Sequence, residues 1–208
     1  MSQSAIEVHE IEQGTEQWHT LRAGLPTASE FSKLVTGTGK KSTQLFDYAA
    51  TLAAELYAGK PLERWEGNSA TERGHEIEPL ARSNYEFQND VEIVQVGFIT
   101  NFGAGCSPDG LVGSAGLIEI KSQLPKGHVQ TLAHYQKNGG PPSGYLPQVQ
   151  GQLLVCERDW CDLCFYHPDL PSLTIRVERD ESYIRELVKG IQLVIEQRDE
   201  LVSMLESA

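Results

Sequence analysis

The sequence lacks the features of a membrane or secreted protein. No apolar run approaches the roughly 18 to 20 residues that span a bilayer. The N-terminus, MSQSAIEVHEIEQ, has neither the basic flank nor the apolar stretch of a secretory signal peptide. The sequence also lacks repeats and low-complexity tracts, and its length of 208 residues suits one domain. We therefore expect a single domain over residues 1–208, located in the cytoplasm and not associated with a membrane.

Cysteine is scarce, with four residues, and without a secretory context these are expected to be reduced thiols. Cys156, Cys161 and Cys164 form a C-x4-C-x2-C run, a spacing that a zinc ion or an iron–sulfur cluster could use. The segment WCDLCFY at 160–166, however, is typical of a strand, whose side chains alternate between two faces. Cys161 and Cys164 then point in opposite directions, so the pattern favours buried structural thiols over a metal cluster.

Basic residues are also few: 17 lysines and arginines stand against 29 acidic residues, and the net charge is −12. A protein that coats nucleic acid with a uniformly basic surface is therefore excluded. A small basic channel inside an acidic exterior is compatible with the same charge. The remaining composition, with 39% hydrophobic and 22% charged residues, is typical of a globular domain.

The order of hydrophobic patterns predicts an α/β fold. The sequence indicates helices opening at 27–30, at about 42–58 and at about 69–85; strands at 91–96, 97–100 and 116–122; helices at about 128–137 and from Leu146; strands at 160–166 and 172–177; and a closing amphipathic helix at about 180–205. TASE and SATE, at the first and third helices, have the spacing of a capping box. We expect a central mixed β-sheet flanked by helices.

The strand LIEIK at 117–121 carries the clearest chemical pattern. Its alternation directs Ile118 and Ile120 into a core and places Glu119 and Lys121 together on the opposite face. Asp109, on the Ser-Pro-Asp-Gly turn before a neighbouring β segment, completes a D…E-x-K arrangement. Metal-dependent phosphodiesterases use this set, because carboxylates hold Mg²⁺ and a lysine orients or deprotonates the attacking water. The alternative is a solvated Glu–Lys pair, which is common on exposed strand faces.

Further motifs extend the pattern over most of the chain. EQGTEQWHTLRAGLPTAS at 12–29, RGHEIEPLA at 73–81, CSPDGL at 106–111, GLIEIKS at 116–122 and YLPQVQ at 145–150 occur together and in this order. The chain thereby resembles the phage lambda exonuclease family, also described as YqaJ-type viral recombinases or phage alkaline exonucleases, a branch of the PD-(D/E)xK nucleases. A set of motifs is much more specific than any single one.

The resemblance implies a fold, an activity and partners. The fold is that of the PD-(D/E)xK, or restriction-endonuclease-like, nucleases. The activity is a Mg²⁺-dependent exonuclease, with Mn²⁺ as a substitute ion, that degrades the 5′-ended strand of linear duplex DNA and leaves 3′ single-stranded overhangs for recombination. The implied assembly is a homotrimeric ring around DNA, working beside a single-strand annealing protein in a bacterial or phage-infected cell.

The resemblance also assigns roles at the metal site. Asp109 and Glu119 match the metal ligands, the backbone carbonyl of Ile120 matches a further ligand, and Lys121 matches the catalytic lysine. Glu78 matches a helical glutamate that can hold a second metal ion. The alternative for Glu78 is a surface charge paired with Arg82 one helical turn later.

A second set of residues resembles a pocket for the 5′-phosphate: Arg22, Ser29, Ser107 and Gln148. Arginine offers a planar fork that matches phosphate oxygens, and a serine in the first turn of a helix adds to its free N–H groups. Ser29 could instead be only a capping hydroxyl, and Ser107 could only shape its turn. Gln148 and Gln152 form a polar row on one helical face, which usually faces water, although the QVQ motif argues otherwise.

Four residues are weaker candidates for contact with DNA: Lys40, Lys41, Tyr145 and Trp65. The two lysines follow a glycine-rich loop and could equally be exposed to solvent. Trp65 could wedge between base pairs or pack in the core.

Two other functions compete with the exonuclease. An iron–sulfur nuclease of the CRISPR-associated type also places cysteines after the E-x-K strand. A non-catalytic scaffold that binds DNA ends would not need the carboxylates, so the joint presence of Asp109, Glu119 and Lys121 argues against it.

Overall fold

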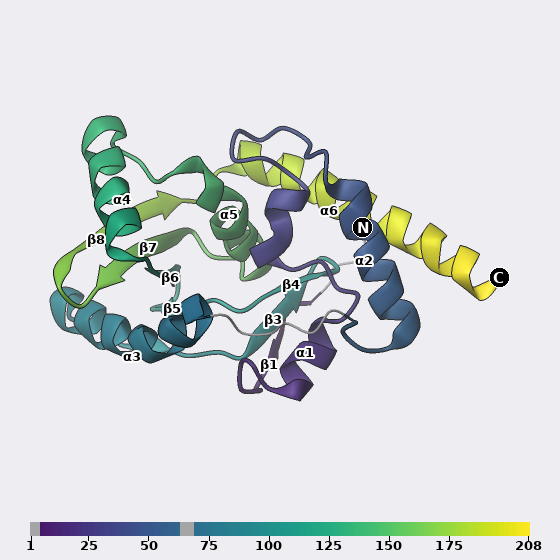
Figure 1. Cartoon of the computed structure of the whole chain (residues 1–208), viewed down its shortest axis with the longest axis horizontal. Helices are drawn as coiled ribbons and strands as arrows, with labels where there is room; N and C mark the ends of the chain where they lie inside the picture. Colours follow the sequence, from purple (N-terminus) through teal and green to yellow (C-terminus); the bar gives the residue numbers. More distant parts are fainter. Residues whose placement is uncertain (1–4, 63–68) are drawn as a thin grey trace.

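A five-stranded mixed sheet forms the centre of the fold (Figure 1). The computed structural model describes residues 5–62 and 69–208; Trp65 lies outside this part of the chain. The sheet has the order β2–β5–β6–β7–β8, with bounds Ile93–Val94, Gly110–Val112, Gly116–Ser122, Trp160–His167 and Leu170–Glu178. Only β6 and β7 pair in parallel; the other neighbours within this sheet are antiparallel. The predicted mixed sheet flanked by helices is confirmed.

A smaller antiparallel sheet lies beside it, in the order β1–β3–β4. Its strands are Glu7–His9, Phe98–Asn101 and Ala104–Cys106. The sequence had predicted strand structure at 97–100 but missed β1, which is only three residues long and pairs with a strand about ninety residues later in the chain. Helix α1, Glu16–Arg22, was also missed; Thr15 caps it by accepting a hydrogen bond from the N–H of Trp18.

Helices cover both faces of the central sheet. On one face, α3 (Ser69–Asn89) buries Ala81 and Tyr85 against Ile118 and Cys164. On the other face, a larger core includes side chains of α2 (Leu45–Ala58), α5 (Leu146–Val155) and α6 (Glu181–Glu206). Figure 1 shows α6 crossing behind α2, with its C-terminal turns extending past the rest of the molecule. Helix α4 spans Pro125–Asn138, and a short 3-10 turn, η2, spans Ser143–Tyr145.

The segment at 28–33 corrects one prediction. It forms a 3-10 helix, η1 (Ala28–Lys33), and the Thr27 side chain does not cap it. The Thr27 hydroxyl instead lies 3.3 Å from Nη2 of Arg22, and the Thr27 N–H donates to the hydroxyl of Tyr48 at 3.1 Å. These tertiary hydrogen bonds replace the local capping box that the spacing TASE had suggested.

No helix in the described ranges combines the length and the apolar character needed to cross a bilayer.

Candidate active site

Strand β6 presents Glu119 and Lys121 on the face that packs against α5. Lys121 Nζ lies 2.7 Å from Glu119 Oε1, and the Glu119 side chain is only 5% exposed. Ile118 and Ile120 point to the opposite face and join the core beneath α3. The predicted division of the strand into two faces is therefore confirmed, and burial of Glu119 rules out the solvated pair.

Asp109 is brought to the same place by the pairing of β5 with β6. Gly110, the next residue, pairs with Ile118, and Asp109 Oδ2 accepts a hydrogen bond of 2.5 Å from the N–H of Ile120. Glycine is required at 110 because a Cβ atom there would lie 2.1 Å from Cγ2 of Ile93. The turn thus holds the Asp109 carboxylate against the edge of the E-x-K strand.

The electrostatics of these groups reflect their crowding. Burial raises the pKa of Asp109 well above its usual value, and the negative charges of Glu119 and Glu78 raise it further. Burial acts to lower the pKa of Lys121, but the neighbouring Glu119 and Asp109 carboxylates outweigh it and the pKa is raised. The raised pKa of Lys121 favours its charged form, whereas the raised pKa of Asp109 shows that a further negative charge at this place is unfavourable.

Helix α5 supplies two glutamine amides to Glu119. Gln148 Nε2 donates to Glu119 Oε1 at 2.7 Å, and Gln152 Nε2 donates to Oε2 at 2.5 Å. Gln148 Oε1 also accepts from Lys121 Nζ at 2.9 Å. The polar row on this helix therefore faces the E-x-K strand and not water, and Gln152 is 1% exposed. The glutamines face inward because a buried carboxylate needs hydrogen-bond donors.

Glu78 approaches the site from α3, on the other face of the sheet. Its charge acts on Asp109, and its carboxylate also forms an ion pair with Arg82. The i,i+4 ion pair between Glu78 and Arg82, which the sequence offered as an alternative, is therefore present. The charge of Glu78 nevertheless contributes to the raised pKa of Asp109. Among the described residues, no three acidic, histidine or cysteine side chains converge closely enough, as they stand, to hold a metal ion together.

The donor set nevertheless suits a divalent cation. Asp109 and Glu119 offer carboxylate oxygens, the ligands that Mg²⁺ prefers, at a place where their charges crowd together. A bound cation would relieve this crowding, which burial makes unfavourable. The side-chain oxygen of Gln152 is buried and has no hydrogen-bond partner, and its amide group lies beside the Glu119 carboxylate.

The second predicted cluster forms around Arg22, at the end of α1. Arg22 Nη2 lies 3.3 Å from the hydroxyls of both Thr27 and Ser29. Its guanidinium stacks on the Trp18 ring at 4.0 Å from the ring centroid, and burial lowers its pKa. The exposed hydroxyl of Ser29 and the fixed guanidinium form a small cationic, hydrogen-bonding surface, which is suited to an anion.

Trp18 links this cluster to Ser107. Its Nε1 donates to Ser107 Oγ at 2.9 Å, and Ser107 donates in turn to the carbonyl of Gly97 at 2.7 Å. Trp18 lies one helical turn before Arg22, a spacing that already indicated that the two side chains could pack together. Gln148, by contrast, bonds to Glu119 and Lys121 and not to Arg22 or Ser29. The structure thus joins three of the predicted phosphate residues and places the fourth with the carboxylates.

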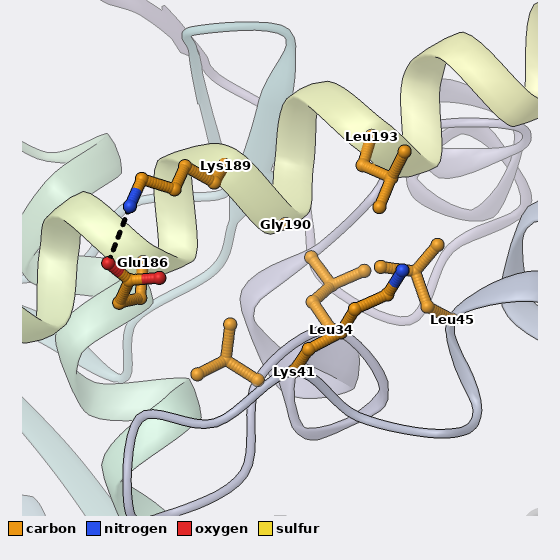
Figure 2. A pocket seen from close by; sticks show the side chains of 8 residues that line it. Leu34, Lys41, Leu45, Glu186, Lys189, Gly190 and Leu193 are labelled. Carbon is orange, nitrogen blue, oxygen red and sulfur yellow. Dashed lines mark hydrogen bonds and ion pairs between the residues drawn. The ribbon is translucent and has the colours of Figure 1, made fainter.

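The weaker DNA candidates fall in different places. Tyr145 lies at the carboxylate site: Lys121 Nζ is 5.7 Å from its ring centroid, and its hydroxyl accepts from Gln123 at 3.0 Å. Lys40 is exposed on a turn. Lys41 lines a pocket of about 180 Å³ beside α6, shown in Figure 2, where its amine points away from the Glu186–Lys189 ion pair. None of the carboxylates of the candidate active site lines this pocket.

The cysteines are all buried. Cys161 packs in the core beneath α5 and α6, whereas Cys164 packs in the core beneath α3. These opposite directions match the alternation read from the sequence and prevent the two thiols from acting as joint ligands. The sulfur atoms of Cys106 and Cys156 lie 3.3 Å apart, and burial raises the pKa of Cys106, so these thiols are structural.

Comparisons with known proteins identify a family and a shared fold. The family model for the YqaJ-like viral recombinase domain matches residues 17–159. An alkaline exonuclease (LHK-Exo) from Laribacter hongkongensis has a TM-score of 0.81 to this chain and 32% identity, over 93% of this chain and 97% of that one. The structure of the same exonuclease in complex with dAMP has a TM-score of 0.80 to this chain and 32% sequence identity. A phage-related exonuclease from Haemophilus somnus, with 17% identity over 87% and 96% of the two chains, shares the fold at a TM-score of 0.69. No protein with a curated description matches the chain.

Proposed function

Because the chain belongs to the YqaJ-like viral recombinase family, we propose that it is a Mg²⁺-dependent exonuclease that degrades the 5′-ended strand of linear duplex DNA and leaves 3′ single-stranded overhangs. The observation that carries the proposal is the meeting of Asp109, Glu119 and Lys121 on paired strands. The similar exonuclease from L. hongkongensis binds dAMP, a nucleotide of the class that such an enzyme would release.

Asp109, Glu119 and the Ile120 carbonyl would hold Mg²⁺, with Glu78 available for a second ion, and Mn²⁺ would substitute. When bound, the ion would polarise the scissile phosphate and activate the attacking water. Lys121, a cation held by Glu119 and Gln148, would orient that water and stabilise negative charge that develops on the phosphate. The glutamine amides keep Glu119 in one orientation, which preserves the geometry that catalysis needs.

Arg22, Ser29 and Ser107 would bind the terminal 5′-phosphate. The Cys106–Gly110 segment joins the two clusters, because Ser107 contacts Trp18 while Asp109 contacts Ile120. An enzyme that grips a terminal phosphate beside its cleavage site recognises ends and not internal positions. Gln148 would act at the cleavage site, and Tyr145 above Lys121 would contact the DNA there.

The assembly and setting belong to the same proposal. We infer one exonuclease domain over residues 1–208, a homotrimeric ring around DNA, a single-strand annealing protein as partner and a cytoplasmic location. An iron–sulfur nuclease is disfavoured because Cys161 and Cys164 point to opposite faces of β7. A non-catalytic scaffold is disfavoured because it would not need Asp109, Glu119 and Lys121, which are present together and meet at one place.

Nucleotide release from linear and closed-circular forms of the same duplex tests the proposal. We expect Mg²⁺-dependent release from the linear form, none from the circular form, and no release with EDTA. Asp109→Asn serves as the control for a contaminating nuclease. Equal digestion of both forms would contradict an exonuclease, and undiminished digestion in EDTA would contradict the metal requirement.

A further inference from the structure

Tyr85 on α3 takes part in a buried polar network on the face of the sheet opposite to α5. Its hydroxyl donates to Asp162 Oδ2 at 2.6 Å, and the two residues are 2% and 3% exposed. Arg176 on β8 donates Nε to Oδ1 and Nη2 to Oδ2 of the same carboxylate, both at 2.8 Å. The guanidinium in turn stacks on the Trp160 ring, 3.7 Å from its centroid. Every oxygen of this buried carboxylate is therefore satisfied.

This network constrains α3 in a way that its apolar contacts do not. Ala81 packs against the sheet beside Tyr85, but apolar contact is non-directional. A hydrogen bond to a fixed acceptor has a narrow range of distance and angle. Asp162 is such an acceptor, because its strand lies between β6 and β8 and Arg176 holds both of its oxygens.

The position of Glu78 depends on that constraint. Glu78 precedes Tyr85 by seven residues, which is about two helical turns, so the two side chains leave the same face of α3. Pro79 lies between them and lacks the N–H that would bond to the carbonyl of residue 75. The turn that carries Glu78 therefore has one helical hydrogen bond fewer, and its placement relies on the docking of the following turns.

We propose that Tyr85, held by Asp162 and Arg176, is a positioning residue that sets α3 along the sheet so that Glu78 faces Asp109 and can share a divalent cation with it. The inference rests on the proposed function, since it requires Glu78 to act as a metal ligand. Ala81 and Tyr85 pack with Ile118 and Ile120 of β6, and the Ile120 N–H bonds to Asp109, so the position of α3 on this strand sets how near Glu78 comes to Asp109.

Tyr85→Phe removes one hydroxyl and keeps the packed ring. Tyr183→Phe is the matched control, because its buried hydroxyl also donates one hydrogen bond, to the carbonyl of Thr36 at 2.8 Å, but lies on α6. We expect both variants to lose a similar amount of stability in urea. Mn²⁺ affinity, measured from the free-ion signal in electron paramagnetic resonance, should fall about tenfold for Tyr85→Phe, as when an outer partner of a metal ligand is lost, and stay unchanged for Tyr183→Phe.

A double-mutant cycle with Glu78→Gln separates positioning from a general structural effect. If Tyr85 acts through Glu78, Tyr85→Phe should not weaken Mn²⁺ binding further once Glu78 is replaced. An equal loss in both backgrounds, or wild-type affinity in Tyr85→Phe, would overturn the positioning role while leaving Glu78 as a ligand. Unchanged affinity in Glu78→Gln would overturn the metal role of Glu78 and this inference with it. Arg176→Lys, at a half-exposed side chain, should also lower Mn²⁺ affinity, because lysine cannot form the bidentate ion pair with Asp162.

Discussion

At the scale of single residues, Glu119 is the centre of the candidate site. Its oxygens accept hydrogen bonds from Lys121, Gln148 and Gln152, which come from one strand and one helix. A carboxylate this deeply buried would be costly to ionise without such donors. The donors fix its orientation, and Gln148 also holds the Lys121 ammonium beside it.

Lys121→Ala tests the role of the ammonium. We expect folding and DNA binding to be retained, because the side chain is not part of either core, and cleavage to fall by at least about a hundredfold. Initial rates of nucleotide release at saturating Mg²⁺ give the comparison. Lys126→Ala removes an exposed lysine a few residues later and should keep the wild-type rate. Near wild-type turnover of Lys121→Ala would remove Lys121 from the mechanism.

Arg22→Ala tests the phosphate pocket. We expect digestion of 5′-phosphorylated ends to slow about tenfold to a hundredfold, the value of a lost charge-assisted hydrogen bond, and digestion of 5′-hydroxyl ends to change little. Arg185→Ala, at an exposed position on α6, is the control and should affect neither substrate. An equal loss on both kinds of end would mean that Arg22 is structural and that its main contact is the stacked Trp18 ring.

Sequence patterns predicted the part of the site that lies within one strand. Strand alternation was sufficient to place Glu119 and Lys121 on one face and Ile118 on the other. It was not sufficient for the partners of Glu119, because the amide of Gln152 comes from a separate helix and no local spacing rule pairs it with a carboxylate 33 residues earlier. The Trp18–Ser107 bond joins residues 89 positions apart, and no spacing rule reports such a contact.

At the scale of elements, the packing of α5 against η1 positions the two glutamines that bind Glu119. Gly151 permits the close approach, since a Cβ atom there would lie 2.3 Å from Phe31 Cδ2 and 3.3 Å from Ala28 Cβ. Gln148 and Gln152 flank this glycine on α5, so the distance between α5 and η1 also determines how the glutamines reach Glu119. The sequence predicted α5, including Pro147 in its first turn, but neither the 3-10 form of η1 nor this contact, which depends on tertiary packing.

Gly151→Ala should therefore disturb the site through packing. We expect a loss of about 1–3 kcal/mol in the free energy of unfolding, measured by urea denaturation, together with slower cleavage. Gly127→Ala is the matched control on α4, where the added methyl meets only ordinary contacts with Gln123. It should gain about 0.4–1 kcal/mol and cleave normally. Equal stability of the two variants would show that α5 can move away from η1 without cost.

At the scale of the whole molecule, the net charge of −12 is unevenly distributed. Exposed acidic residues follow α6 along its length: Glu181, Glu186, Glu196, Asp199, Glu200 and Glu206. By contrast, the two cations of the candidate site, Arg22 and Lys121, are partly buried. In a ring with α6 outward, DNA would be repelled from the acidic exterior and attracted only to the channel.

The ring account predicts salt-sensitive binding in spite of the negative net charge. We expect the affinity for duplex ends, measured in Ca²⁺ to suppress cleavage, to fall at least about tenfold between about 50 mM and 200 mM NaCl. Light scattering should give the mass of three chains. A strictly monomeric protein with full activity would contradict the ring, although the nuclease proposal would survive. Salt-independent binding would contradict a cationic channel.

The central claim is that this chain removes nucleotides from the 5′-ended strand, and strand polarity tests it most directly. A 5′-phosphorylated linear duplex with a fluorophore at each 3′ end is incubated with the protein and Mg²⁺, and the strands are resolved on a denaturing gel. Digestion from 5′ ends should give labelled strands that shorten progressively while keeping their label. Immediate release of labelled mononucleotides, or strands that stay at full length while Asp109→Asn behaves identically, would contradict the account.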